Sequence, residues 1–233
     1  MPDINCSVQD WGRISYKTAW EQQTAIANEL IQAKKNTDPF NEPIPHSLIF
    51  CEHNPVYTLG KSGSIDNVLL NEKELELKGI EFFKINRGGD ITYHGPGQIV
   101  CYPIFDLDRI FTDVHKYVRG IEEVVIRTLA EYGLDAMRIN EYTGVWLEGN
   151  DVLPKRKICA IGVHLSRWVS MHGFAFNINT DLAYFNHIIP CGIADNDKAV
   201  TSLALELGRS IDPEEVKLKI LFHFSEIFGL KYA

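Results

Sequence analysis

The sequence predicts a single α+β domain. Short apolar segments with the pattern of β-strands interleave irregularly with segments that have helical spacing, and no repeat period is present. The chain has 233 residues, of which 45% are hydrophobic, and this is enough to bury a sizeable core. No stretch has the composition of a linker, so we expect residues 1–233 to form one domain.

Charge and cysteine spacing disfavour several classes of protein. A formal net charge of -8 argues against a nucleic-acid binder, which needs a concentrated excess of Lys and Arg. No apolar run approaches the ~18 residues of a membrane helix, and the N-terminus lacks a signal-peptide pattern, so we expect a cytoplasmic protein. The cysteines are odd in number, scattered and without C-x-x-C pairing, which disfavours disulfides and structural zinc: Cys6, Cys51, Cys101, Cys159 and Cys191.

Two strands and two helices are expected before the middle of the chain. We expect an edge strand over Val8–Trp11 and another strand over Ser47–Cys51. Asn71, followed by a glutamate three residues later, has the capping-box pattern and predicts a short helix over 71–79. Ser15 is suited to cap the other helix, whose apolar residues lie near one face: Tyr16, Trp20, Ala27 and Ile31.

The stretch from Arg87 to Gln98 reads RGGDITYHGPGQ, and the rest of the chain is organised around it. Its glycines and its proline bend the backbone, and glycine lets the main chain approach a ligand closely. We predict a polar, glycine-rich loop between two buried strands; an elaborate hairpin turn is the alternative. The flanking apolar residues are Phe82, Phe83 and Ile85 before it, and Ile99, Val100, Tyr102, Ile104 and Phe105 after it.

The second half of the chain predicts two helices and three strands. The helix over 113–133 has the clearest apolar spacing, and the last helix begins at Asp212, with a proline at its first position, and ends near Gly229. Strands are expected over 144–147, 157–165 and 173–178, and the last two are close enough for a hairpin. We expect the polar face of the first helix to be a solvated surface: Lys116, Arg119, Glu122 and Glu123.

Three residues are candidates for covalent chemistry. Cys191 lies between a proline and a glycine in a turn, where its thiol can be exposed, although a free cysteine is more often a small buried hydrophobe. Lys157 opens an apolar strand, either as a snorkelling edge residue or as a desolvated lysine that moves a proton or pairs with a thiolate. Cys159 lies two residues further along that strand, where alternation predicts the same face, and is a rival nucleophile.

Three histidines near glycines are candidates for a base. His94, inside the polar stretch, is the best of them for a role in a site. His164 alternates with apolar neighbours and is expected to face solvent, and His172 precedes a glycine. None of them has a metal-ligand spacing such as H-E-x-x-H, so we expect no metal site.

Taken together, these segments resemble a family, the lipoyl(octanoyl) transferases of lipoate biosynthesis. The resemblance covers about residue 5 to residue 208, in family order, and this ordered set is highly specific. Two positions depart from the family pattern: Lys61 stands where arginine is common, and Cys159 where alanine is frequent. The matching stretches are HNPVYTLGK from His53, RGGDITYHGPGQ from Arg87, TGVW from Thr143, KICAIG from Lys157, HGFAFN from His172, PCGI from Pro190 and TSL from Thr201.

The resemblance implies the fold of the biotin and lipoate protein ligase catalytic domain, a mixed sheet with packed helices. It also implies a reaction: an octanoyl group moves from acyl carrier protein to a lysine on lipoyl domains of 2-oxoacid dehydrogenase complexes and on the glycine cleavage H protein. The reaction needs neither ATP nor a metal, because a thioester is already activated. The family's nucleophile falls on Cys191 and its lysine partner on Lys157.

The resemblance also implies the residues that bind the acyl group. They fall on three of the matching stretches: Arg87, Gly88, Gly89, Asp90, Ile91, Thr92, Tyr93 and His94; Ala160, Ile161 and Gly162; and His172, Gly173 and Phe174. Acyl carrier proteins are usually acidic, and this chain is acidic too. We therefore expect a local basic cluster of Lys155, Arg156 and Arg167 to dock the carrier, unless it is only a solvated turn.

Three other functions remain as alternatives. A lipoate or biotin protein ligase shares the fold and a comparable lysine, but forms an acyl-adenylate from ATP and does not need the cysteine. An amidotransferase moves octanoyl or lipoyl groups between carrier domains by the same cysteine chemistry. A module that binds acyl carrier protein without catalysis is disfavoured by the presence of both Cys191 and Lys157.

Overall fold

Most strands of the protein belong to one mixed sheet. The structure is a computed structural model, and it describes residues 4–35, 44–150, 153–190 and 198–232. Within these residues the large sheet has nine strands, in the order β12-β1-β2-β6-β10-β9-β8-β7, with β11 beside β9. Their bounds are β12 Leu230–Tyr232, β1 Ile4–Ile14, β2 His46–His53, β6 Gln98–Ile104, β10 Val169–Asn177, β9 Lys155–Ser166, β8 Tyr142–Leu147, β7 Ala136–Ile139 and β11 Lys198–Val200.

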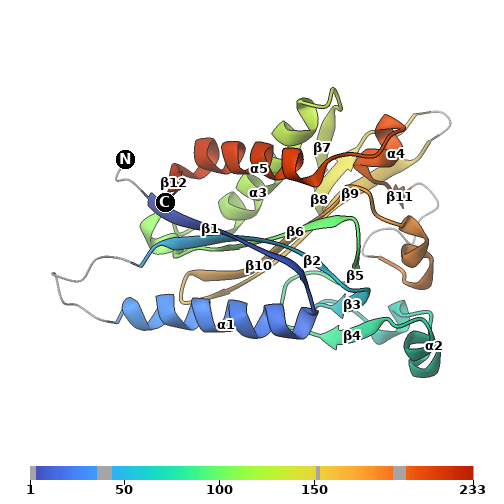
Figure 1. Ribbon diagram of the computed structural model, residues 1–233, viewed down its shortest axis with the longest axis horizontal. Coiled ribbons are helices and arrows are strands. Elements are labelled where there is room, and N and C mark those ends of the chain that lie inside the picture. Colours follow the sequence, from blue (N-terminus) through green and yellow to red (C-terminus); the bar gives the residue numbers. More distant parts are fainter. Residues whose placement is uncertain (1–3, 36–43, 151–152, 191–197, 233) are drawn as a thin grey trace.

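Helices cover both faces of the large sheet (Figure 1). The helices α3 (Val114–Ala130) and α5 (Pro213–Phe228) lie on one face, and α1 (Tyr16–Ala33) lies on the other. The main apolar core is packed between the sheet and α3 and α5, where Phe224 is fully buried. The short helix α4 (Leu203–Leu207) precedes α5. No helix among the described residues is long and apolar enough to cross a membrane.

A second, three-stranded sheet lies on the α1 side, in the order β4-β3-β5 (Figure 1). Its strands are β3 (Val56–Leu59), β4 (Glu81–Lys84) and β5 (Ile91–His94), and α2 (Glu72–Leu77) connects β3 to β4. Aromatic rings form its core, where Tyr93 is stacked on Tyr184 with 4.6 Å between ring centroids. Short 3-10 turns at 65–67, 107–109 and 182–187 complete the fold. The predicted α+β class is confirmed.

The glycine-rich stretch differs from the prediction. Its middle is the strand β5, which pairs antiparallel with β3, so only 87–90 and 95–97 are loop or turn. The flanking strands lie in different sheets, and the two phenylalanines of β4 are only half-buried. The prediction of a loop between two buried strands is therefore wrong. The strand β3, which pairs with β5, lies more than thirty residues earlier in the chain, so no local pattern shows this pairing.

Helix ends follow the local capping signals. Ser15 accepts a hydrogen bond from the backbone N–H of Thr18, and Asn71 and Glu74 form the reciprocal capping box of α2. Asp212 caps α5, and Gly229 ends it in the left-handed conformation with φ +70°. These predicted starts and stops are confirmed.

The first strand and the first helix are close to what was predicted. The strand over Val8–Trp11 is the part of the longer β1 that pairs with β2 alone, because β12 pairs only with Ile4 to Cys6, so the prediction of an edge strand is confirmed for these residues. On α1, Tyr16 and Ala27 are buried as predicted, and Trp20 and Ile31 are half-buried at the margin of the buried face, which also contains the fully buried Gln23.

The prediction of a solvated polar face on α3 is wrong at Glu122, which is fully buried. Its Oε2 accepts hydrogen bonds from Arg119 Nη1 at 2.8 Å and from Arg138 Nε at 3.1 Å. Its Oε1 accepts the backbone N–H of Gly144 on β8 at 3.1 Å. A buried carboxylate is retained only when it is paired in this way, and the partners on β7 and β8 are not visible in the helix sequence.

A β-bulge interrupts the alternation of β9. Consecutive residues Val145 and Trp146 of β8 pair with Cys159 and Lys157, so Ile158 is an extra residue on β9. As a result Ile158 and Cys159 both pack into the core under α3 and α5, whereas Lys157 stays on the opposite side. The prediction that Lys157 and Cys159 share a face is therefore wrong.

Candidate active site

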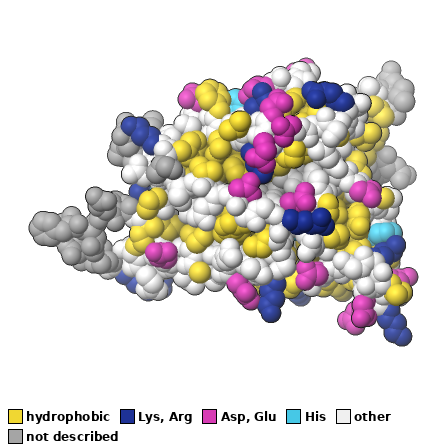
Figure 2. All heavy atoms as spheres, viewed as in Figure 1, with side chains coloured by type: hydrophobic (Ala, Val, Ile, Leu, Met, Phe, Trp, Pro, Cys, Tyr) yellow, Lys and Arg dark blue, Asp and Glu magenta, His cyan; other side chains and the backbone are white. Residues whose placement is uncertain are grey.

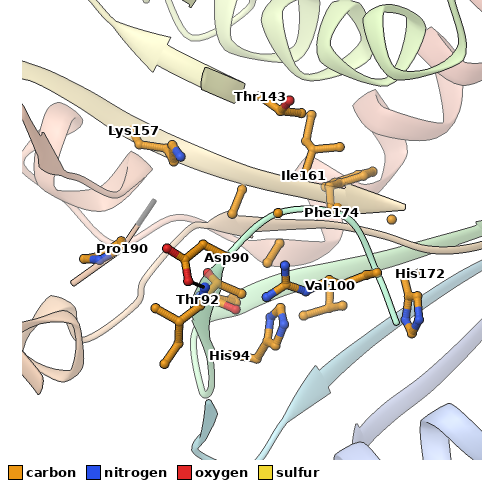
Figure 3. Close-up of a pocket in the computed structure, with 18 of the residues that line it drawn as sticks. Asp90, Thr92, His94, Val100, Thr143, Lys157, Ile161, His172, Phe174 and Pro190 are labelled. Carbon is orange, nitrogen blue, oxygen red and sulfur yellow. Dashed lines mark hydrogen bonds between the residues drawn. The ribbon is translucent and has the colours of Figure 1, made fainter. Parts of the chain in front are cut away.

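A pocket of about 310 Å³ lies between the small sheet and the strands β6, β9 and β10 of the large sheet. In Figure 3, Lys157 and Pro190 lie at one end of the pocket and His172 at the other, with His94 on the side of the small sheet. The predicted residues that line it are Arg87, Gly89, Asp90, Ile91, Thr92, His94, Lys157, Ala160, Ile161, Gly162, His172, Gly173 and Phe174.

Two of the predicted acyl-binding residues do not line this pocket. Gly88 lies just outside, where its backbone N–H donates to the carbonyl of Val163 on β9 at 2.9 Å and ties the loop to the large sheet. Tyr93 points to the opposite side of β5, into the aromatic core of the small sheet. Side chains alternate along a strand, so Thr92 and His94 face the pocket while Tyr93 does not.

Arg87 holds the glycine-rich loop in place from inside. Its side chain is buried, and Nη2 donates to the carbonyl of Thr58 at 2.6 Å and to Thr58 Oγ1 at 3.0 Å. The loop crosses β9 at Gly162, where a Cβ would lie 2.8 Å from the carbonyl oxygen of Gly88 and 2.9 Å from Arg87 Cδ. A side chain at Gly162 would therefore push the two sheets apart and open the pocket wall.

Lys157 lies near the start of β9 and lines the pocket. It is half-buried, and its Nζ lies 4.6 Å from the centroid of the Trp146 ring. Pro190 lines the same end of the pocket. The predicted nucleophile, Cys191, is the next residue in the sequence and lies outside the described residues, so its role stays a prediction.

Cys159 has the surroundings of a structural thiol. It is fully buried, its Sγ lies 3.7 Å from the carbonyl oxygen of Ala160, and burial raises the pKa of its thiol well above the usual value. It does not line the pocket. A thiol that stays protonated and has no access to substrate is unreactive, which disfavours Cys159 as the rival nucleophile.

The histidines differ in position and in ionisation. His94 and His172 line the pocket, whereas His164 does not and is half-buried. Burial, with smaller contributions from His53 and Arg87, lowers the pKa of His94 well below its usual value. Burial, followed by the charge of Arg87, lowers the pKa of His172 to about 3. Both rings are therefore neutral near pH 7, and they serve better as hydrogen-bonding walls than as general bases.

His172 is held in an uncommon backbone conformation. Its φ is +60°, in the left-handed region that non-glycine residues rarely adopt. Its backbone N–H donates to Gln23 Oε1 at 3.1 Å, and its Nε2 lies 3.2 Å from Asn86 Oδ1. Contacts from α1 and from the segment after β4 thus fix the ring at the end of the pocket opposite Lys157.

Sequence reasoning missed several residues that line the pocket. Thr143 belongs to the T-G-V-W stretch, and Gln98 closes the glycine-rich stretch, so the family motifs already contained a signal for these two. Tyr16, the first residue of α1, carries no local signal, because helix α1 meets the pocket only in the folded chain. The remaining missed residues are Ser62, Val100, Tyr102, Glu141, Ala175, Asn177, Phe185, Pro190 and Val200.

The expected basic cluster does not form. Arg156 makes a two-pronged ion pair with Glu206, with Nε–Oε1 2.7 Å and Nη2–Oε2 2.9 Å, and Lys155 lies 3.3 Å from Glu148. Arg167 lies in the turn at the other end of β9, beyond Ser166. On the face shown in Figure 2, Lys and Arg side chains are scattered among Asp and Glu. Within the described ranges, no group of His, Cys, Asp or Glu is arranged to hold a metal ion.

The fold and the family agree with known proteins. Residues 15–225 match the family model of the lipoyl protein ligase A/B catalytic domain, and the chain belongs to that family. Among solved structures, a bipartite lipoate protein ligase from Thermoplasma acidophilum has a TM-score of 0.69 at 17% identity, covering 99% of this chain and 86% of that chain. A lipoate-protein ligase A bound with ATP has a TM-score of 0.68 at 16% identity, covering 99% and 87%. At this identity these structures show the fold alone.

Relatives of higher sequence identity carry the name octanoyltransferase. A protein of Flavobacterium johnsoniae named octanoyltransferase is 55% identical over 95% of either chain. One of Christiangramia forsetii with the same name is 56% identical over 97% of either chain. The resemblance drawn from the sequence motifs, to the octanoyltransferases, is confirmed.

Proposed function

We propose that this chain transfers an octanoyl group from acyl carrier protein to the lysine of lipoyl domains through a thioester on Cys191. The observation that carries the proposal is the match to octanoyltransferases at 55% identity over nearly the whole chain. The geometry adds support, because Lys157 and Pro190, the residue before Cys191, line the same end of one pocket. The proposal treats residues 1–233 as one catalytic domain.

The first half of the reaction acylates the enzyme. The Cys191 sulfur attacks the carbonyl carbon of the octanoyl thioester, a new C–S bond forms, and the bond to the carrier's thiol breaks. The departing carrier thiolate takes up a proton from the Lys157 ammonium, which becomes neutral. Lys157 assists, because an ammonium group beside a thiol favours the thiolate form and lowers the thiol pKa.

The second half releases the product. The ε-amine of the acceptor lysine attacks the same carbonyl carbon, a C–N bond forms, and Cys191 leaves as thiolate. The proton lost by the amine passes to the thiolate or to Lys157 in its neutral form. Both halves exchange one acyl derivative for another and need no nucleotide.

The walls of the pocket suit a saturated acyl chain. Ala160 and Gly162 present little side chain, and Val100 and Ala175 supply apolar surface on the α1 side of the sheet. We propose that the chain extends from Lys157 toward His172, with its carbonyl near Thr143 and Pro190. The acyl-binding roles of the other lining residues stay predictions.

The partners and the compartment are also proposals. We propose lipoyl domains of 2-oxoacid dehydrogenase complexes and the glycine cleavage H protein as acceptors, and the cytoplasm as the place of reaction.

The proposal is tested by intact-protein mass spectrometry. The purified protein is mixed with octanoyl-acyl carrier protein without ATP, and the adduct is located by peptide mapping. We expect one octanoyl group on Cys191, discharged when a lipoyl domain is added. Acylation of the domain only after ATP and free octanoic acid are supplied would instead establish a ligase. Using an octanoylated lipoyl domain as donor in a parallel sample tests for the amidotransferase.

A further inference from the structure

The T-G-V-W stretch of β8 has a feature that acyl binding does not explain. Trp146 pairs with Lys157 across the β8–β9 ladder, and the Nζ of Lys157 lies 4.6 Å from the centroid of its ring. Trp146 is fully buried and does not line the pocket. Its ring is therefore in contact with Lys157 rather than with a substrate.

The orientation of the Trp146 ring is fixed by its surroundings. Its Nε1 donates to the carbonyl oxygen of Tyr142 at 3.4 Å, and the Tyr142 ring lies 6.1 Å away. A fully buried indole in a packed strand has no room to turn. The face of the ring is thus a preformed surface with negative electrostatic potential, which attracts a cation.

The backbone leaves a place for the lysine beside this ring. Gly144 has φ +127°, and a Cβ there would lie 2.6 Å from the carbonyl oxygen of Cys159 and 3.6 Å from Lys157 Cε. The backbone N–H of Gly144 donates a hydrogen bond to Oε1 of the buried Glu122 on α3 at 3.1 Å. The bulge at Ile158 turns Lys157 to this side. The glycine, the bulge and the carboxylate together shape the space that the lysine occupies.

We infer that Trp146 is a positioning residue that holds the ammonium of Lys157 at the Pro190 end of the pocket and favours its charged form. The inference rests on the proposed function, in which that ammonium stabilises the Cys191 thiolate. Titratable groups on the elements around Lys157 include Cys159 behind the strand, Glu122 beyond Gly144, Glu141 at the pocket wall, and Tyr142 of β8 with Lys198 of β11 over its ring.

The test measures how fast iodoacetamide alkylates Cys191 as a function of pH, with peptide mapping to exclude the buried cysteines. Lys157→Ala is measured first and gives the full effect of losing the cation. We expect Trp146→Leu to raise the midpoint of the alkylation profile by about one pH unit, because the lysine is no longer held near the thiol. Trp146→Phe, which retains an aromatic face, should recover most of this shift.

Steady-state kinetics give a second readout. Trp146→Leu should lower kcat about tenfold and leave KM for octanoyl-acyl carrier protein within twofold, since the ring does not touch the acyl chain. Leu147→Ala is the matched control, because Leu147 is a buried neighbour on β8 that packs into the main core. It should lower the melting temperature without moving the alkylation midpoint.

Fluorinated tryptophan keeps the test decisive if Trp146→Leu does not fold. In a variant with Trp11, Trp20 and Trp168 replaced by Phe, only Trp146 carries the label. Each added fluorine weakens the potential of the ring face at nearly constant shape, so the alkylation midpoint should rise with each fluorine. No trend, together with an unshifted Trp146→Leu, would overturn the inference. An unshifted midpoint in Lys157→Ala would instead overturn the lysine–cysteine pairing of the proposed function.

Discussion

On β9, Ile158 and Cys159 pack into the core beneath α3 and α5, whereas Lys157 and Ala160 line the pocket on the opposite side. The two pairs are neighbours in the sequence, but they differ in burial and in access to the pocket. The β-bulge at Ile158 lies at the boundary between the two kinds of surroundings. Regular alternation would place Cys159 on the same side as Lys157, and the bulge places it in the core instead.

The largest expected difference is between the two candidate nucleophiles, Cys191 and the buried Cys159. Cys191→Ala should lower octanoyl transfer by about 10³-fold or more, because the covalent intermediate is lost. Cys159→Ala should leave the transfer rate within twofold and lower the free energy of unfolding by about 1–3 kcal/mol. Transfer assays and urea unfolding on both variants check this. Full activity of Cys191→Ala would sink the nucleophile assignment, and inactivity of a folded Cys159→Ala would return the rival.

The second comparison uses adjacent residues on β9. Lys157→Ala should slow transfer by roughly 10²–10⁴-fold, as expected for loss of a group that moves a proton, with little change in stability. Ile158→Ala should do the reverse: it leaves a cavity in the core that costs about 2–5 kcal/mol, while the folded fraction retains activity. Single-turnover rates and thermal unfolding distinguish the two. If both variants lose stability equally, the bulge does not separate the faces as described.

The smallest expected effect is a dependence of stability on pH. Burial lowers the pKa of His46, which packs against Phe105 in the core, and of His172 in the pocket wall, each to about 3. The unfolded chain binds these protons from about pH 6.5 downward and the folded chain does not. Stability is therefore lost as pH falls below that value, by up to about 1.4 kcal/mol per pH unit for each histidine.

One histidine lies in the core and the other in the pocket wall, so substitutions of the two should differ in their effect on activity. His46→Asn and His172→Asn should each flatten the fall in the free energy of unfolding between pH 6.5 and 5, measured by urea titration. Only His172→Asn should also alter octanoyl transfer, because asparagine tolerates the left-handed backbone but presents a smaller wall to the acyl chain. An unchanged slope in both variants would show that other groups govern the acid sensitivity.

Helix ends and part of the pocket lining could be predicted from the sequence. The caps at Ser15, Asn71 and Asp212 depend on groups within three residues of one another, so the local pattern determines them. The pocket residues that were predicted belong to the family motifs. Most of them line one cavity, although they lie on separate elements such as β5, β9 and β10.

The features that the sequence could not predict depend on distant partners. Glu122 looks like a surface acid until Arg138 and Gly144 are brought to it by β7 and β8. The bulge at Ile158 is defined only by pairing with β8, and β5 is hidden in a glycine-rich stretch because its partner is β3. Periodicity describes one element at a time, whereas these features arise between elements.

The pairing of β12 with β1 has a consequence for how the chain is made. Ile4 lies opposite Leu230 in a parallel register, so the first strand of the large sheet finds its outer neighbour at the far end of the sequence. On the ribosome, the start of β1 keeps an unpaired edge until residue 230 has emerged. Contacts that span so much chain form late, and an open edge invites pairing with other chains. The nascent protein therefore keeps this short edge open to pairing with other chains until β12 has been made.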